Sequence, residues 1–340
     1  QLDHFDAVDG AALGGVLVPT LFSWGRALLN AGDLAAWGSS GYYLACGACL
    51  AFAIVPWCAC MGATIPFAQF TIRKYFPEES EKSFSYLYLA NVLGAASGAL
   101  LSAFVLIELF GFKGTLLATA ALNVIMAAIA YRASFLPIPK TSSEKPIDSV
   151  SRAAVSAPRH LLGLLFLTGC VSMAMEVIWT RQLIPYLGLH IYSFASILAL
   201  YLLAANLGSF VYRRSSRRHD AGHGGVLLAL VGLSGAMTLV FADPRLPVGS
   251  GLLGDALRLF LCVTPLSAAV GFLTPMLVDL WSRGDPEKAG YSYAVNILGC
   301  IAGPLLAGFL LLPWMGERWA VLAALSPLFI AAIASQARKA

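Results

Sequence analysis

Apolar residues form long runs along almost the whole chain, and short polar segments separate these runs. Each run holds enough residues to cross the ~30 Å hydrocarbon core of a bilayer as a helix. The alternation of apolar and polar positions that is typical of a membrane β-barrel is not found. The pattern predicts nine transmembrane helices, over residues 41–69, 84–110, 115–131, 160–181, 191–212, 224–241, 253–281, 289–312 and 319–336. A further segment, 11–29, is either a tenth span or an interfacial helix, because Pro19, Trp24 and Arg26 interrupt it.

Composition strengthens this interpretation. Hydrophobic residues make up 59% of the 340 positions and charged residues only 12%, against about 25% charged residues in a soluble domain. The mean hydropathy is +0.76. We therefore predict an all-α polytopic membrane protein with about nine to ten spans. Its predicted partner is the lipid bilayer, and no nucleic-acid partner is expected.

The distribution of Lys and Arg predicts the orientation. If 11–29 is a span, the segments that share a side with the C-terminus carry 16 of the 22 Lys and Arg residues, and the opposite side carries 6. The positive-inside rule then places the C-terminus and the RRSSRR loop (213–218) in the cytoplasm, and we expect a bacterial inner membrane. The basic loop is explained by topology, although a patch for acidic lipid is the alternative.

A segment rich in Pro, Ser and charge, 133–158, predicts a flexible cytoplasmic linker between two transmembrane halves. The first half would be 1–132, an N-terminally incomplete repeat, and the second half 159–340, with six helices. The first residue is Gln1 and not Met, which fits either a processed chain or a piece of a longer one.

The two halves have identical residues at positions separated by a fixed offset. YLYLANVLGAASG (86–98) and YSYAVNILGCIAG (291–303) are identical at six of thirteen positions at an offset of 205. Pro66 and Pro275 correspond at an offset of 209. Prolines at matching places in two halves are typical of repeat-built membrane folds. Both matched sets run in the same membrane direction, so we predict parallel repeats related by an axis along the membrane normal.

The matched prolines suggest a role for a matched pair of asparagines. Pro66 and Pro275 would break their helices and free the carbonyls of Gly62 and Gly271, four residues earlier. The side chains of Asn91 and Asn296, on the next helices, could supply the missing donors. Small residues at Gly94/Gly98 and Gly299/Gly303 would let those helices approach closely. Either this pattern serves packing alone, or the broken helices line a substrate pathway.

A second group of candidates is Glu176, Trp179 and Arg181, near the outer end of helix 160–181. Trp and Arg at a helix end are typical of an interfacial anchor. A carboxylate within a span is a functional hypothesis, with a ligand or a proton as its partner. Arg258, near the start of its own helix, is expected to reach the outer interface and be solvated.

Other chemistry is not indicated. All seven Cys fall in apolar spans, where a thiol behaves as a small hydrophobe, and neither Cys nor His shows metal-ligand spacing. We assign no catalytic residue, no metal and no cofactor to the chain.

Three stretches resemble the membrane-bound spermidine synthase-like family. They are MEVIWTRQLIPYLGLHIYSFASILALYLLAANLGS (175–209), MGATIP (61–66) and YLYLANVLGAASGALLSAFVLIELFGFKGTLL (86–117). The resemblance implies a polytopic, major-facilitator-like region followed by a cytoplasmic aminopropyltransferase domain. Such a domain transfers an aminopropyl group from decarboxylated S-adenosylmethionine to putrescine. This co-substrate would bind only where a synthase domain is attached, since GHGG (222–225) lacks the βαβ context of a nucleotide site.

Three functions follow as hypotheses. The chain is the transmembrane domain of a spermidine synthase-like protein, which anchors or supplies a catalytic domain outside these residues. Alternatively, it is a small-molecule transporter of the major-facilitator-like type, or a non-catalytic scaffold subunit of a membrane complex.

Overall fold

The computed structural model describes residues 17–30, 38–75, 80–135, 158–188, 190–215, 224–249, 251–282 and 286–337. In these ranges the chain forms helices and turns and no strand, which confirms the all-α class. Residues 17–30 are helical, and the rest of the predicted segment 11–29 falls outside the described residues. The predicted linker 133–158 also falls outside them, apart from its ends.

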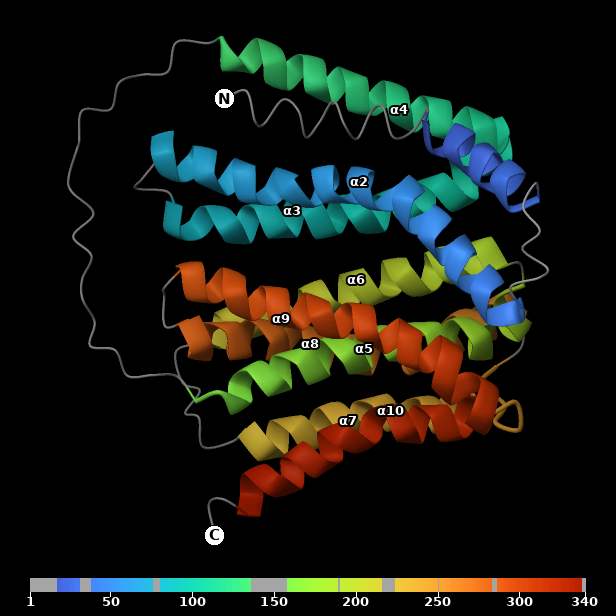
Figure 1. The fold of residues 1–340 in the computed structure, drawn as a ribbon. Coiled ribbons are helices and arrows are strands. Elements are labelled where there is room, and N and C mark those ends of the chain that lie inside the picture. Colours follow the sequence, from blue (N-terminus) through green and yellow to red (C-terminus); the bar gives the residue numbers. More distant parts are fainter. Residues whose placement is uncertain are drawn as a thin grey trace. The chain divides into compact units, whose positions relative to one another are not determined.

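The helices are shown in Figure 1. The chain forms two compact units, one of Gln1–Ala90 with Phe104–Asp148 and one of Asn91–Ala103 with Ser149–Ala340. The early elements are α2 (Gly38–Tyr75), α3 (Ser80–Leu101), the π-helix η3 (Ser102–Leu106) and α4 (Ile107–Ser134). The later ones are α5 (His160–Leu187), α6 (His190–Ser215), α7 (Gly224–Phe241), α8 (Gly251–Ser282), α9 (Pro286–Leu305), the π-helix η6 (Leu306–Leu311) and α10 (Leu312–Ala337).

Each of the nine predicted spans coincides with described helix. Within the described residues, six stretches are long and apolar enough to cross a membrane, and Gly225–Phe241 is a shorter apolar helix. Two of the six, Ala90–Arg132 and Lys288–Ser335, contain 43 and 48 residues. As straight helices they would be about 65 to 72 Å long, roughly twice the hydrocarbon thickness. Each therefore has the length of two spans.

A glycine turns the chain inside each of these two stretches. Gly111 has φ 64° and ψ 179°, and Gly316 has φ 71° and ψ 175°. Figure 1 shows α10 running back toward the end at which α9 begins. These torsions require glycine, because a Cβ excludes them for other residues. The paired spans predicted on either side of each glycine are consistent with these turns.

The hydropathy pattern did not predict the π-helices. Both precede a turning glycine, η3 before Gly111 and η6 before Gly316. At the end of η6 the N–H of Leu312 donates to the carbonyl of Ala307, five residues earlier. A π-helical turn widens the helix by the equivalent of one residue and often occurs at functional positions.

In the second unit, α5 is the central helix. It packs against α6, α8, α9 and α10, while α6 packs along α8 and α7 along α10. The core is built around fully buried side chains of α5, among them Leu165, Met175, Ile178, Trp179 and Leu183. A residue on α5 is therefore well placed to contact several other helices.

The four residues predicted to break helices lie within helical segments. Gly62 and Pro66 lie inside α2, and Gly271 and Pro275 lie inside α8, each a continuous helix. A proline removes one backbone hydrogen bond, and the neighbouring bonds can hold the helix together around it. Neither proline ends its helix, and the predicted bends at Pro66 and Pro275 stay predictions.

Candidate functional site in the second helical unit

Asn296 joins α9 to α5 rather than to α8. Its Nδ2 donates to the carbonyl of Leu165 at 2.8 Å and lies 3.4 Å from the hydroxyl of Thr168. The side chain is buried. The sequence predicted a polar contact between helices but the wrong acceptor, the carbonyl of Gly271. Pro275 has no N–H to donate to the carbonyl of Gly271, but the amide of Asn296 is bonded to α5 instead.

Three glycines bring α5 and α9 together at this contact. A Cβ on Gly299 would lie 2.0 Å from the carbonyl oxygen of Phe166, and one on Gly303 would lie 2.2 Å from that of Cys170. On the facing helix, a Cβ on Gly169 would lie 2.3 Å from the carbonyl oxygen of Asn296. Backbones that approach this closely leave no room for a side chain. The close approach predicted for Gly299 and Gly303 is confirmed, and Gly169 was missed.

Gly271 has a similar packing role where α6 crosses α8. A Cβ there would lie 2.1 Å from the carbonyl oxygen of Ala205. On α6, a Cβ on Gly208 would lie 1.9 Å from that of Ala268. The glycine therefore serves helix packing at this crossing.

The corresponding residues of α3 do not show these contacts. Asn91 is exposed, and a Cβ on Gly94 or Gly98 would have no described atom within 4 Å. The role predicted for Asn91 stays a prediction.

Trp179 lies in the core, so it is not an interfacial anchor. Its indole N–H donates to the hydroxyl of Thr238 on α7 at 2.9 Å. That hydroxyl in turn donates to the carbonyl of Cys262 on α8 at 3.2 Å. A buried indole needs such a partner, and the chain of two bonds links three helices.

Arg181 is exposed and pairs with Glu317, with 3.3 Å between Nε and Oε1. A second ion pair lies beside it, with 2.7 Å between Arg318 and Asp243. The backbone N–H of Arg245 holds the pKa of Asp243 below its usual range, and the charge of Arg318 acts in the same direction. Both pairs use residues directly after the turning glycine of α10.

A cavity of about 290 Å³ lies beside these ion pairs. The ends of α5 and α7, the loop after α7 and the Gly316 turn line it. Its polar lining includes the buried Gln182, whose Oε1 has no hydrogen-bond partner among the described residues. The sequence pattern did not predict this cavity, because the spacing of Gln182, Asp243 and Glu317 along the chain does not link them.

Arg258 is buried, and the expectation that it is solvated is wrong. Its guanidinium donates to the carbonyls of Phe241, Asp243 and Leu246, at 2.5, 2.9 and 2.8 Å. It also lies over the ring of Tyr186, 4.4 Å from the centroid. The carbonyls at a helix end have no N–H donor within the helix. The guanidinium of Arg258, on the neighbouring helix α8, supplies donors to these carbonyls.

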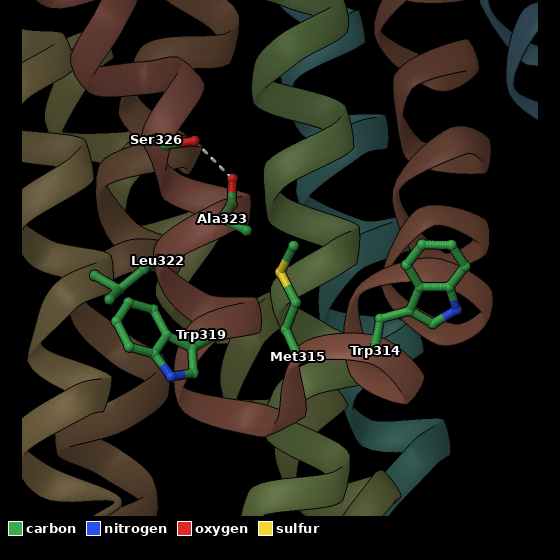
Figure 2. A pocket seen from close by; sticks show the side chains of 6 residues that line it. All are labelled: Trp314, Met315, Trp319, Leu322, Ala323 and Ser326. Atoms are coloured by element: carbon green, nitrogen blue, oxygen red, sulfur yellow. Dashed lines mark hydrogen bonds between the residues drawn. The ribbon is translucent and has the colours of Figure 1, made fainter.

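A larger hollow of about 640 Å³ on α10 is an open surface feature. Figure 2 shows its two indoles, Trp314 and Trp319, on opposite sides of Met315. These two tryptophans are 80% and 67% exposed. The only hydrogen bond drawn among the six lining residues is within α10, from Ser326 to the carbonyl of Ala323. Exposed tryptophans beside a turn are typical of the level where a span meets the lipid headgroups.

Glu176 lies on α5 and is half-buried. Its backbone carbonyl accepts a hydrogen bond from the hydroxyl of Thr180. Within the described residues, no hydrogen bond or ion pair reaches its carboxylate. Both sequence interpretations of Glu176, an anchor and a functional carboxylate, stay predictions.

The comparisons with known proteins give one similarity of note. The chain is 31% identical over 129 residues to polyamine aminopropyltransferase 2 of Streptomyces coelicolor. The match covers 36% of this chain and 23% of that protein, so the chain spans about a quarter of the relative's length. No family model and no solved structure matches. The similarity supports a relationship to a polyamine aminopropyltransferase over about a third of the chain.

Proposed function

We propose that the chain is the membrane-embedded region of a spermidine synthase-like protein, which anchors or supplies a cytoplasmic aminopropyltransferase domain. The observation that carries the proposal is the similarity to a polyamine aminopropyltransferase. The long apolar helices support the membrane-embedded part of the proposal, because their length and composition suit a bilayer.

In this function the described residues provide a scaffold. The α5–α9 and α6–α8 crossings hold their helices at backbone contact distance, and such contacts resist relative movement. Transfer of the aminopropyl group would take place in the catalytic domain. Decarboxylated S-adenosylmethionine is assigned to that domain, because the described helices offer no loop between a strand and a helix that could hold a nucleoside.

The test uses the complete reading frame that encodes this chain. Membranes from cells expressing it are supplied with putrescine and radiolabelled decarboxylated S-adenosylmethionine, and labelled spermidine is measured. We expect activity in the membrane fraction, and in the soluble fraction when residues 38–337 are deleted in frame. A reading frame that produces no spermidine in either fraction overturns the proposal.

We also propose that the two halves form a parallel internal repeat of the major-facilitator-like kind. In support, Gly111 and Gly316 stand 205 residues apart with nearly equal torsions. A π-helix precedes each of them. An experimental structure should superpose 80–134 on 286–337 by rotation about an axis near the membrane normal, and an inverted relation would contradict the repeat.

For the orientation, we propose a bacterial inner membrane with the C-terminus in the cytoplasm. The support is the excess of Lys and Arg on that side, 16 against 6. This orientation puts an attached C-terminal domain where its substrates are.

A further inference from the structure

Four polar side chains recur at every fourth position of α5. They are Thr168, Ser172, Glu176 and Thr180, and the other residues between Leu167 and Trp179 are apolar side chains, glycine or cysteine. In an α-helix, residues four apart lie nearly above one another, so the four form one slanted row. The row extends over ~18 Å, more than half of the hydrocarbon thickness.

The row is turned toward the neighbouring helices. Thr168 and Ser172 are fully buried. The hydroxyl of Thr168 lies 3.4 Å from the amide of Asn296 on α9, and that of Ser172 lies 3.0 Å from the hydroxyl of Tyr201 on α6. Glu176 and Thr180 are half-buried. Ser and Thr often bond across membrane helices, and an ionisable residue that faces the bundle interior often marks an ion or proton pathway.

No described cation compensates Glu176. On the helices that pack against α5, the titratable side chains away from the helix ends are Tyr201 on α6, Cys262 on α8 and Cys300 on α9. None of these side chains carries positive charge. Arg181 pairs with Glu317, Arg318 pairs with Asp243, and Arg258 is bound to three carbonyls. A carboxylate left in apolar surroundings without a partner is costly, so it tends to bind a proton or a cation.

We propose that this row is a proton pathway through the second unit, with Glu176 as the group that takes up and releases the proton. The carboxylate accepts a proton from a hydronium ion or water on one side, and gives it to a water molecule on the other. The hydroxyls of Ser172, Tyr201 and Thr180 can each donate and accept, which a relay requires. Neighbours in the row are about 5–6 Å apart at Cβ, a gap that one water molecule can bridge.

A proton suits the row better than a larger solute. The two pockets described above lie at the end of α5 and on the surface of α10, so neither is built around Glu176. A metal ion needs several ligating groups, and no cluster of three His, Cys, Asp or Glu side chains occurs among the described residues. A proton moves along hydrogen bonds and needs only hydroxyls, water and a titratable group.

The test is proton flux through the full-length protein in liposomes of phosphatidylethanolamine and phosphatidylglycerol. A potassium gradient with valinomycin drives protons inward, and an enclosed pH-sensitive dye reports acidification. We expect flux above that of empty liposomes, and a reduction of roughly tenfold or more in Glu176→Gln, as for loss of a proton-transferring side chain. Glu176→Asp should retain flux, and Ser172→Ala should lower it in part.

The matched control is Glu108→Gln. Glu108 is exposed on α4 and lies outside the row, so this change should leave the flux unaltered. Thermal unfolding in detergent confirms that each variant is folded. The proposal is overturned if the unsubstituted protein conducts no protons, or if Glu176→Gln conducts as well as the parent. Flux that appears only when putrescine is present also overturns it, because the carboxylate then serves an ammonium group. The spermidine assay above does not depend on any of these results.

Discussion

At the scale of single residues, Asn296 supplies a donor where two helices touch. Its amide is buried and bonded to the carbonyl of Leu165. Neither group can turn to water at this depth, so losing the amide leaves the carbonyl with one bond fewer.

We expect Asn296→Leu to lower the free energy of unfolding by about 0.6–2 kcal/mol, the range for hydrogen bonds between membrane helices. The change keeps a similar volume and removes the donor. The measurement is equilibrium unfolding in mixed micelles. The control is Ile297→Leu at the neighbouring exposed residue. This change should alter the free energy of unfolding by less than about 0.5 kcal/mol. Equal stability of the Asn296 variant and the parent would show that the bond contributes nothing.

Asp243 gives a prediction about pH. Its pKa in the folded protein is lowered from the ordinary value of 3.8, first by the backbone N–H of Arg245 and then by Arg318. Ionised Asp243 therefore stabilises the folded state at pH values above 3.8, and this contribution is lost as the pH falls through the lower folded-state pKa. The melting temperatures of the parent and Asp243→Asn should differ above about pH 5 and converge in stronger acid. A difference that grows on acidification would contradict this account.

At the scale of the elements, the α5–α9 pair depends on the absence of side chains. Phe166 and Cys170 present backbone atoms to α9 where Gly299 and Gly303 leave room. The pair can therefore be disturbed by a single methyl group.

Gly299→Ala should destabilise the protein by about 1–3 kcal/mol, because the new Cβ forces the two backbones apart. The same measurement on Gly163→Ala is the control, since a Cβ there meets no atom within 4 Å. We expect no loss of stability in that variant. If the two variants behave alike, close backbone packing does not hold α5 to α9.

The sequence predicted the helices well and their contacts less well. Each of the nine spans predicted from hydropathy falls on described helix, because each segment must by itself be long and apolar enough to cross the bilayer. The partners of Asn296, Trp179 and Arg258 depend on which helices become neighbours, and no local pattern contains that information. The π-helices were also missed, since one extra residue per turn leaves the apolar run unchanged. Pro275 does not end α8, because the tertiary surroundings of a helix can override the low helix propensity of one residue.

At the scale of the whole molecule, the distribution of charge predicts which loops face the cytoplasm. The test introduces single cysteines into a cysteine-free version and adds a membrane-impermeant maleimide to intact cells. Cysteines in the loops 132–159 and 213–223, at Ser142 and Ser216, should react only after the cells are opened. A cysteine at Val248, between α7 and α8, should react at once. The reverse pattern would invert the topology.

The turning glycines have a consequence for inherited variation. Every single-nucleotide missense change of a glycine codon introduces a residue with a Cβ. At Gly111 and Gly316, φ is positive and ψ is close to 180°, a combination that even Asn and Asp, which tolerate other left-handed conformations, rarely adopt. Each such allele would carry a penalty of about 1–3 kcal/mol for backbone strain. We expect natural populations to carry few missense alleles at these two codons, in contrast to Gly163, where an added methyl group meets open space.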